Sequence, residues 1–134
     1  MVSLVTADND YQLEQATSAQ EAASRRGVEV EIVYADGDSI QQSQQILKFV
    51  QADRGSRPDG IIVEPVGGTG LPQVARAAVA AGIGWVLLNL KAGYIKELRQ
   101  SFKIPVFVLG CGTSRVKNSA RARVVTMTFD PSTR

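Results

Sequence analysis

The chain has 134 residues, of which 44% are hydrophobic and 21% are charged, a composition that fits one globular domain with a single core. Its net charge of +2 is too small to indicate a nucleic-acid partner. The absence of histidine removes the commonest general base and metal ligand, and the single Cys111 excludes an internal disulfide or a cysteine-rich zinc site. We therefore expect no metal or other cofactor.

No apolar stretch approaches the roughly 18–20 residues that a membrane span needs. The first residues already read as a strand, without the basic and long apolar regions of a signal peptide. These residues alone leave two expectations: a cytoplasmic protein, or one whose export signal is not part of this sequence.

The first half of the chain reads as strand, helix, strand, helix. A strand is expected over residues 2–6, followed by a helix over 11–26 that Gly27 ends. The small-residue face of that helix is expected to lie close to a sheet and consists of Leu13, Ala16, Ala19 and Ala23. Residues 29–35 predict an edge strand, and Asp38 or Ser39 caps a helix whose apolar residues are Ile40, Ile46, Leu47 and Val50.

The second half continues the alternation. Three β-branched residues within 61–64 predict a central strand buried on both faces. Helices are expected over 71–81 and 94–102, and strands over 84–89 and 104–109. Five strands joined by short helical connections predict an α/β fold: a three-layer, doubly wound, five-stranded parallel sheet in the flavodoxin-like order 2-1-3-4-5.

The alternation stops after Gly110, which divides the chain into a lobe over residues 1–110 and an irregular basic tail over 111–134. Within the tail, residues 124–129 are either one added strand or an irregular end. A basic tail can bind phosphate, but a solvated terminus is the simpler interpretation.

Polar residues stand where three of the predicted strands end, and ligands of open α/β sheets bind at that edge. Asn9, Tyr11 and Gln12 follow the first strand, Glu64 follows the third, and Asn89 ends the fourth. Amides and a tyrosine ring suit a polyhydroxylated ligand, although residues 8–10 also fit a simple helix cap. The glycine-rich loop 64–70 lacks the spacing of a phosphate-binding loop and reads as a turn. No pair of nucleophile and base is evident, so we expect no enzymatic activity.

The residues in this order resemble the N-terminal lobe of type I periplasmic binding proteins, the sugar-binding group that includes ribose-binding protein. The resemblance covers about residues 2–109 and rests on Asp38, Gln42 and Ile46, and on the runs 58–65 and 77–83. Asn9 and Tyr11, followed by Ala19, Gln20 and Gly27, match the first loop and helix of that pattern.

The resemblance implies binding of a small carbohydrate-like solute, with a membrane ABC permease or a sensor as partner, in the periplasm. It implies that Asn9 hydrogen-bonds the ligand and that Tyr11 stacks on it, while Gln12 stands where a second aromatic residue is common. Asn89 matches the polar residue that ends the fourth strand. Leu90 replaces an arginine often found there, unless Lys91 substitutes for it.

The family needs a second lobe that these residues do not encode, so we expect a half-protein with weak or no binding on its own. A homodimer through the exposed lobe surface would supply a second wall. Two other functions stay open: a structural or assembly module without a ligand, and a flavodoxin-like receiver domain. Glu64 at the position of the phosphoacceptor aspartate argues against the receiver.

Overall fold

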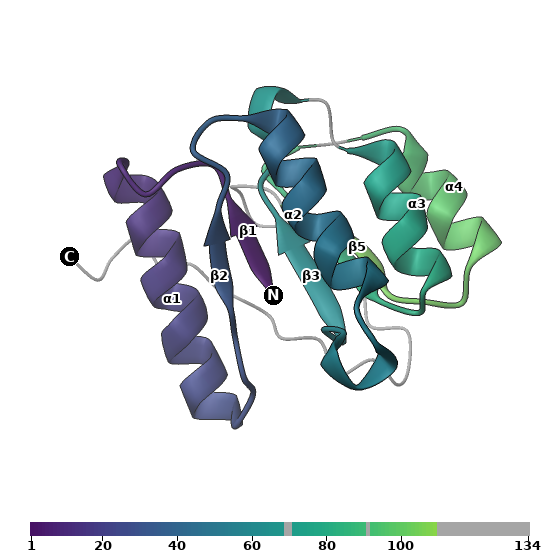
Figure 1. The fold of residues 1–134 in the computed structure, drawn as a ribbon, viewed down its shortest axis with the longest axis horizontal. Coiled ribbons are helices and arrows are strands. Elements are labelled where there is room, and N and C mark those ends of the chain that lie inside the picture. Colours follow the sequence, from purple (N-terminus) through teal and green to yellow (C-terminus); the bar gives the residue numbers. More distant parts are fainter. Residues whose placement is uncertain (69–70, 91, 110–134) are drawn as a thin grey trace.

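A five-stranded parallel sheet forms the centre of the protein. The computed structural model describes residues 1–68, 71–90 and 92–109, and its strands are β1 (Val2–Leu4), β2 (Ile32–Tyr34), β3 (Gly60–Val63), β4 (Gly84–Leu88) and β5 (Val106–Leu109). Their order in the sheet is β2-β1-β3-β4-β5, and every adjacent pair is parallel (Figure 1). The predicted order is thereby confirmed, with β2 at an edge and β3 in the centre.

Helices connect consecutive strands. They are α1 (Asp10–Arg26), α2 (Ser39–Gln51), α3 (Pro72–Ala80) and α4 (Tyr94–Ser101), and two short 3-10 helices, η1 (Arg54–Ser56) and η2 (Val66–Gly68), lie within the loops. Asn9 caps α1 and Asp38 caps α2, each with its side-chain oxygen on amides of the first turn. Gly27 follows α1 with a φ of 63°, a left-handed conformation that glycine adopts without steric cost.

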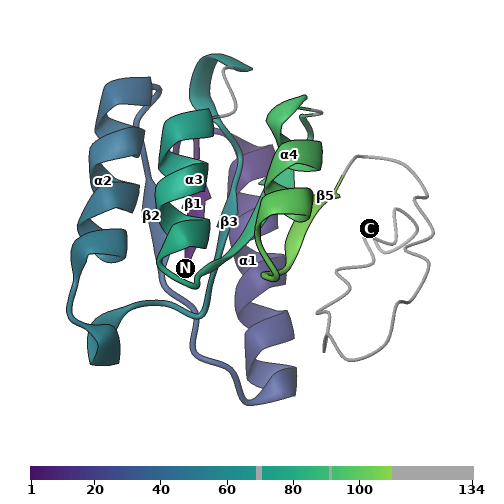
Figure 2. The same cartoon turned by 90° about the vertical axis from the view of Figure 1, so that its right-hand side faces the viewer.

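The larger part of the core lies between one face of the sheet and the helices α2, α3 and α4. Ile61 and Val63 of β3 and Trp85 and Leu87 of β4 are fully buried there, together with Ile46 of α2. Figure 2 shows these three helices side by side along the sheet. Their connections place α1 on the opposite face, which gives the three-layer, doubly wound architecture.

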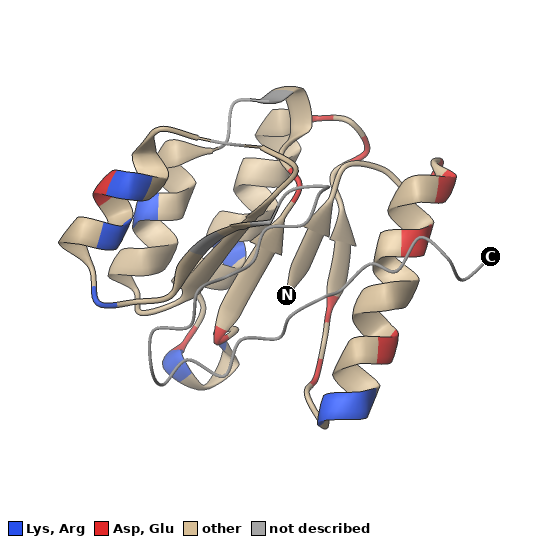
Figure 3. Cartoon of the chain, turned by 180° about the vertical axis from the view of Figure 1, so that it is seen from behind, with Lys and Arg blue, Asp and Glu red and all other residues tan. Residues whose placement is uncertain are grey.

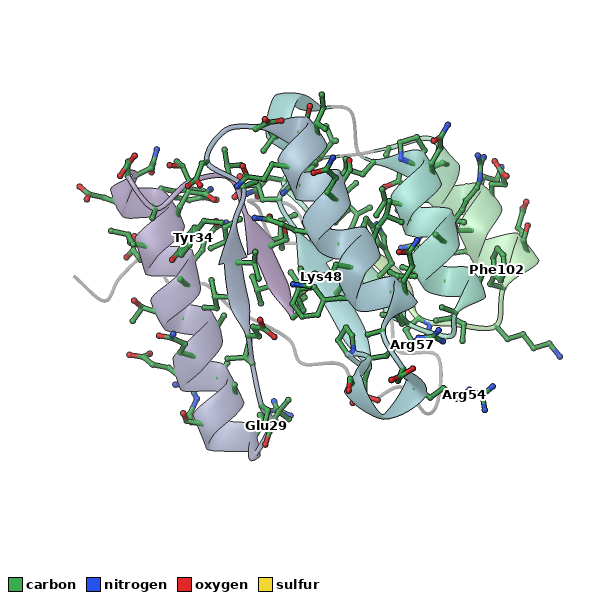
Figure 4. All side chains as sticks on the ribbon, in the orientation of Figure 1. Glu29, Tyr34, Lys48, Arg54, Arg57 and Phe102 are labelled. Carbon is green, nitrogen blue, oxygen red and sulfur yellow. The ribbon has the colours of Figure 1, made fainter. Side chains whose placement is uncertain are left out.

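Helix α1 covers the other face over β1 and β2. Val2 and Leu4 of β1 pack against Ala16 and Ala19 of α1, and Tyr34 lies between α1 and β2 (Figure 4). The buried stripe of α1 begins at Gln12, whereas Leu13, which the sequence placed on the inner face, is 44% exposed. The buried stripe of α1 runs through Gln12, Ala16, Ala19 and Ala22, and Leu13, about 100° round the helix from Gln12, lies on its solvent side.

Helix α2 also carries a glutamine on its inner face. Its buried residues are Gln42, Ile46 and Val50, spaced four residues apart, while Ile40 is 68% exposed. A residue two positions from Gln42 lies about 200° round the helix, so Ile40 cannot share that stripe. In both helices a glutamine thus takes an inner position, Gln12 in α1 and Gln42 in α2.

Some element bounds differ from the sequence prediction. The strand expected from residue 29 begins only at Ile32, because its partner β1 has just three residues to pair with it. The strand expected to begin at residue 104 begins at Val106. The predicted basic tail and its extra strand, along with Cys111, lie outside the described residues.

Side chains cover carbonyl groups of both outer strands of the described sheet. Gln45 of α2 donates from Nε2 to the carbonyl of Tyr34 in β2, at 2.9 Å. Arg99 of α4 donates from Nε to the carbonyl of Val106 in β5, at 2.7 Å. An exposed ion pair between Arg76 and Glu97 joins α3 to α4. Within the described part of the chain, no helix has the length and apolarity required to cross a bilayer.

Candidate functional site

Four polar side chains from three segments of the chain meet at the edge of the sheet where the strands end, the upper edge in Figure 1. We call Tyr11, Gln12, Glu64 and Asn89 the strand-end cluster. Asn89 donates from Nδ2 to the hydroxyl of Tyr11 at 2.8 Å and to Oε1 of Glu64 at 3.3 Å. Gln12 donates from Nε2 to Oε2 of Glu64. Parallel strands bring these residues together although up to 78 positions separate them in the chain.

Glu64 is the centre of the cluster. It directly follows β3, and its amide still donates to the carbonyl of Ser3 in β1, at 3.0 Å. Each carboxylate oxygen accepts a hydrogen bond from a side-chain amide, one from Gln12 and one from Asn89. An ionised carboxylate has about four acceptor sites, so Glu64 keeps acceptor capacity for a further donor such as a hydroxyl group.

Asn89 reaches the cluster because the chain turns sharply after β4. Its φ is 57°, in the left-handed region that few residues other than glycine and asparagine enter readily. This conformation ends the strand at Leu88 and directs the amide toward Tyr11 and Glu64. The amide is exposed and can also bond a ligand at this edge.

Gln12 supports the cluster from inside. It is 4% exposed, its Oε1 accepts from the amide of Val5 at 2.7 Å, and its Nε2 contacts Oε1 of Gln15 as well as Glu64. The sequence predicts Gln12 as a ligand residue, and the structure places it in the cluster with its amide engaged by the protein.

Asn9, another predicted site residue, makes a helix-capping contact beside the cluster. Asn9 uses its Oδ1 to accept from the amide of Tyr11 at 2.8 Å, as the N-cap of α1. The helix-cap interpretation of this loop is thereby confirmed, with Asn9 as the N-cap and Asp10 as the first residue of α1. Lys91 lies outside the described residues.

A residue that the sequence analysis did not assign to the site lies directly beneath it. Gln42 of α2 is fully buried and bonds Ser3 of β1 and both ends of the loop that follows β3, at Glu64 and Val66. The sequence feature that could have identified Gln42 is its spacing: it lies four residues before Ile46 and eight before Val50, on the same face of the helix.

The edge around the cluster carries negative charge. Asp8, Asp36 and Asp38 lie in the loops after β1 and β2, and Glu64 follows β3, whereas the described residues of the strand-end loops include no lysine or arginine. Figure 3 shows acidic residues in these loops and along α1. Such an edge repels anionic ligands and suits neutral molecules with several hydroxyl groups.

The described residues include no group of three or more histidine, cysteine, aspartate or glutamate side chains that could hold a metal ion.

A shallow hollow over the second half of α2 lies away from the strand ends, and Figure 4 labels Lys48, one of the residues that line it. Near the start of α4, burial raises the pKa of the Tyr94 hydroxyl above its ordinary value, and a hydrogen bond with Trp85 acts in the opposite direction.

Comparison with known proteins gives a family and a fold. The model of the periplasmic binding protein domain family matches residues 1–101. Among solved structures, the chain is similar to the periplasmic binding protein component of the arabinose ABC transporter from Shewanella sp. ANA-3, bound to alpha and beta-L-arabinofuranose, with 22% identity and a TM-score of 0.61. The match covers 71% of this chain but only 31% of that one, so it indicates a shared fold over about a third of the neighbour. No curated protein matches the sequence.

Proposed function

Because this chain belongs to the periplasmic binding protein domain family, we propose that its strand-end cluster is one wall of a binding site for a small sugar-like solute. The observation that carries the proposal is the hydrogen-bonded meeting of Tyr11, Glu64 and Asn89 from three different strand ends. The cluster combines an aromatic ring, a carboxylate and an amide, which is the mixture that recognises hydroxyl groups and the apolar face of a sugar ring.

Each member of the wall has a distinct role in this proposal. The ring of Tyr11, which is 41% exposed, stacks on the ligand. Glu64 accepts hydrogen bonds from ligand hydroxyls, and Asn89, whose two amide hydrogens are engaged by Tyr11 and Glu64, offers its Oδ1 as an acceptor. The acidic edge excludes phosphorylated or carboxylated sugars. None of these groups forms a nucleophile–base pair, so the function is binding without catalysis.

The solved neighbour is named as a component of an arabinose ABC transporter, which supports a solute-binding role in periplasmic uptake for this chain, with an ABC permease or a sensor as partner. The chain covers 31% of that neighbour. A single wall contacts only one side of a ligand and leaves the other side in water, so we expect dissociation constants in about the millimolar range or weaker.

The test is a titration of the full, isotopically labelled chain with L-arabinose and D-ribose, followed by NMR. We expect concentration-dependent shifts in residues 9–12, 64–66 and 89, and none at the far end of α1. The variant Asn89→Gly keeps the left-handed backbone but removes the side-chain amide, and should abolish most of the shifts. The matched control Gln20→Ala removes an exposed amide on α1 away from the edge and should leave them unchanged.

Absence of any shift at the cluster, or equal shifts in Asn89→Gly and the parent chain, would contradict the proposal. Sub-micromolar binding by a proven monomer would contradict the single-wall idea while retaining the sugar ligand. The titration gives both the shifts and the dissociation constant, and a measurement of molecular mass in solution shows whether the protein is a monomer.

A second candidate is an assembly module that forms a homodimer. It is favoured by Val86 and Leu88 of β4, which are only partly buried and alternate with the buried Trp85 and Leu87, so that they lie on the other face of the sheet. Analytical ultracentrifugation decides between a monomer and a dimer. A dimer that dissociates in Val86→Lys and does not respond to sugars would favour this candidate over solute binding.

A further inference from the structure

The loop that carries Glu64 is fastened from below by one buried side chain, and we propose that this side chain, Gln42, is a positioning residue for the ligand wall. The inference rests on the proposed function, because it concerns the same wall. It adds a residue that touches no ligand, lies in a helix and acts through Glu64.

Gln42 uses both ends of its carboxamide. Its Nε2 donates to the hydroxyl oxygen of Ser3 at 3.1 Å and to the carbonyl of Glu64 at 2.9 Å, and its Oε1 accepts from the amide of Val66 at 2.9 Å. The residue is fully buried, as is Ser3. One side chain therefore connects α2 with β1 and with the loop that leaves β3.

The backbone of this loop needs such a partner. Strand β3 ends at Val63, and Pro65 has no amide hydrogen to donate. The carbonyl of Glu64 and the amide of Val66 leave the hydrogen-bond ladder of the sheet at a buried position, where an unpaired polar group is costly. A primary amide offers a donor and an acceptor at one point, so glutamine satisfies both groups from the same helix position.

Fixing the backbone on both sides of Pro65 also fixes the origin of the Glu64 side chain. Its two carboxylate oxygens must reach Gln12 on one side and Asn89 on the other. Hydrogen bonds weaken steeply once the donor–acceptor distance or angle departs from its optimum, so a small displacement of the loop breaks at least one of them. We therefore expect that loss of the Gln42 amide loosens the strand-end cluster while the core stays folded.

The variant Gln42→Met tests this, because methionine keeps the length of the side chain and removes its donor and acceptor. The matched control is Ile46→Ala, which lies one turn further along the same buried stripe of α2 and bonds no part of the loop. Urea titrations identify conditions in which both variants are folded, and all comparisons are made there. A merely structural role of Gln42 would make the two variants behave alike.

The first measurement needs no ligand: solvent exchange of the Gln12 side-chain amide protons, observed by NMR. We expect about tenfold faster exchange in Gln42→Met, since about 1.4 kcal/mol, within the range for one buried hydrogen bond, corresponds to tenfold. Ile46→Ala should stay within about twofold of the parent chain, as expected of independent sites. Unchanged exchange in Gln42→Met, or equal acceleration in both variants, would overturn the inference.

The second measurement is the affinity for L-arabinose, which should fall about tenfold in Gln42→Met and stay unchanged in Ile46→Ala. If the parent chain binds no sugar, the proposed function fails, and the exchange measurement still decides whether Gln42 positions Glu64. If Gln42→Met does not fold, Ser3→Ala replaces it, because it removes only one of the three bonds of Gln42. Faster Gln12 exchange in Ser3→Ala would support the inference, and parent-like exchange would overturn it.

Discussion

Two neighbouring positions of α1 make opposite predictions about stability. Gln12 is 4% exposed and bonds Val5, Gln15 and Glu64, whereas Leu13 is 44% exposed. A reading by hydrophobicity alone would make Leu13 the core residue. In the structure, Gln12 is the buried residue whose replacement should lower the free energy of unfolding.

The first change is Gln12→Leu. It leaves the amide of Val5 without its side-chain acceptor and removes a donor from the Glu64 carboxylate. Leaving a buried donor or acceptor unsatisfied costs about 1–3 kcal/mol, and the added apolar atoms of leucine offset part of this. We therefore expect the free energy of unfolding to fall by about 1–2 kcal/mol.

The second change is Leu13→Gln, which has nearly the same helix propensity and faces outward. Surface substitutions of this kind usually change stability by less than about 0.5 kcal/mol. Urea denaturation followed by circular dichroism measures both variants under the same conditions. The reasoning is refuted if Leu13→Gln destabilises the chain more than Gln12→Leu does, because α1 would then present the other residue to the sheet.

Three further outcomes follow from contacts elsewhere. Asp38→Ala removes the cap that accepts from two amides of the first turn of α2, and should lower the free energy of unfolding by about 1 kcal/mol in the same urea assay. An unchanged free energy of unfolding would contradict a stabilising role of this cap. Burial raises the pKa of Tyr94, so the folded state holds the phenol proton more tightly than the unfolded state does. The free energy of unfolding should therefore decline as the pH rises above the unfolded pKa of 10.0, and it should decline less in Tyr94→Phe. Urea midpoints of the two proteins that change with pH in parallel would contradict this. Arg76→Ala breaks an exposed ion pair with Glu97 and should cost no more than about 1 kcal/mol, an effect that 1 M salt should largely erase if it is electrostatic.

Much of the fold could be predicted from the sequence because it depends on regular signals. The β-branched run at Ile61 to Val63 predicted the central strand, and Gly27 predicted the end of α1. The short connections predicted parallel strands joined by right-handed crossovers, and the observed strand order is the flavodoxin-like one that we expected. These signals are local or depend on general rules, so a single sequence carries them.

The site was only partly predictable. Position at a strand end was enough to select Tyr11, Glu64 and Asn89, because parallel strands all end at one edge. The inward orientation of Gln12 and the loop contacts of Gln42 were not predictable, since polar residues at core positions run against the hydrophobic pattern. Gln12 bonds the distant Glu64 side chain and Gln42 bonds backbone groups of Glu64 and Val66, and such pairings exist only in the folded chain.

The side chains that cover the outer strands bear on how copies of this protein behave at high concentration. An uncovered edge strand offers unpaired carbonyl and amide groups on which a strand from another molecule can add. Gln45 occupies the carbonyl of Tyr34 on β2, and Arg99 occupies that of Val106 on β5, where it also brings a positive charge. In the described sheet, each outer strand thus has one carbonyl that a strand from another molecule cannot use, because the neighbouring helix already supplies its donor.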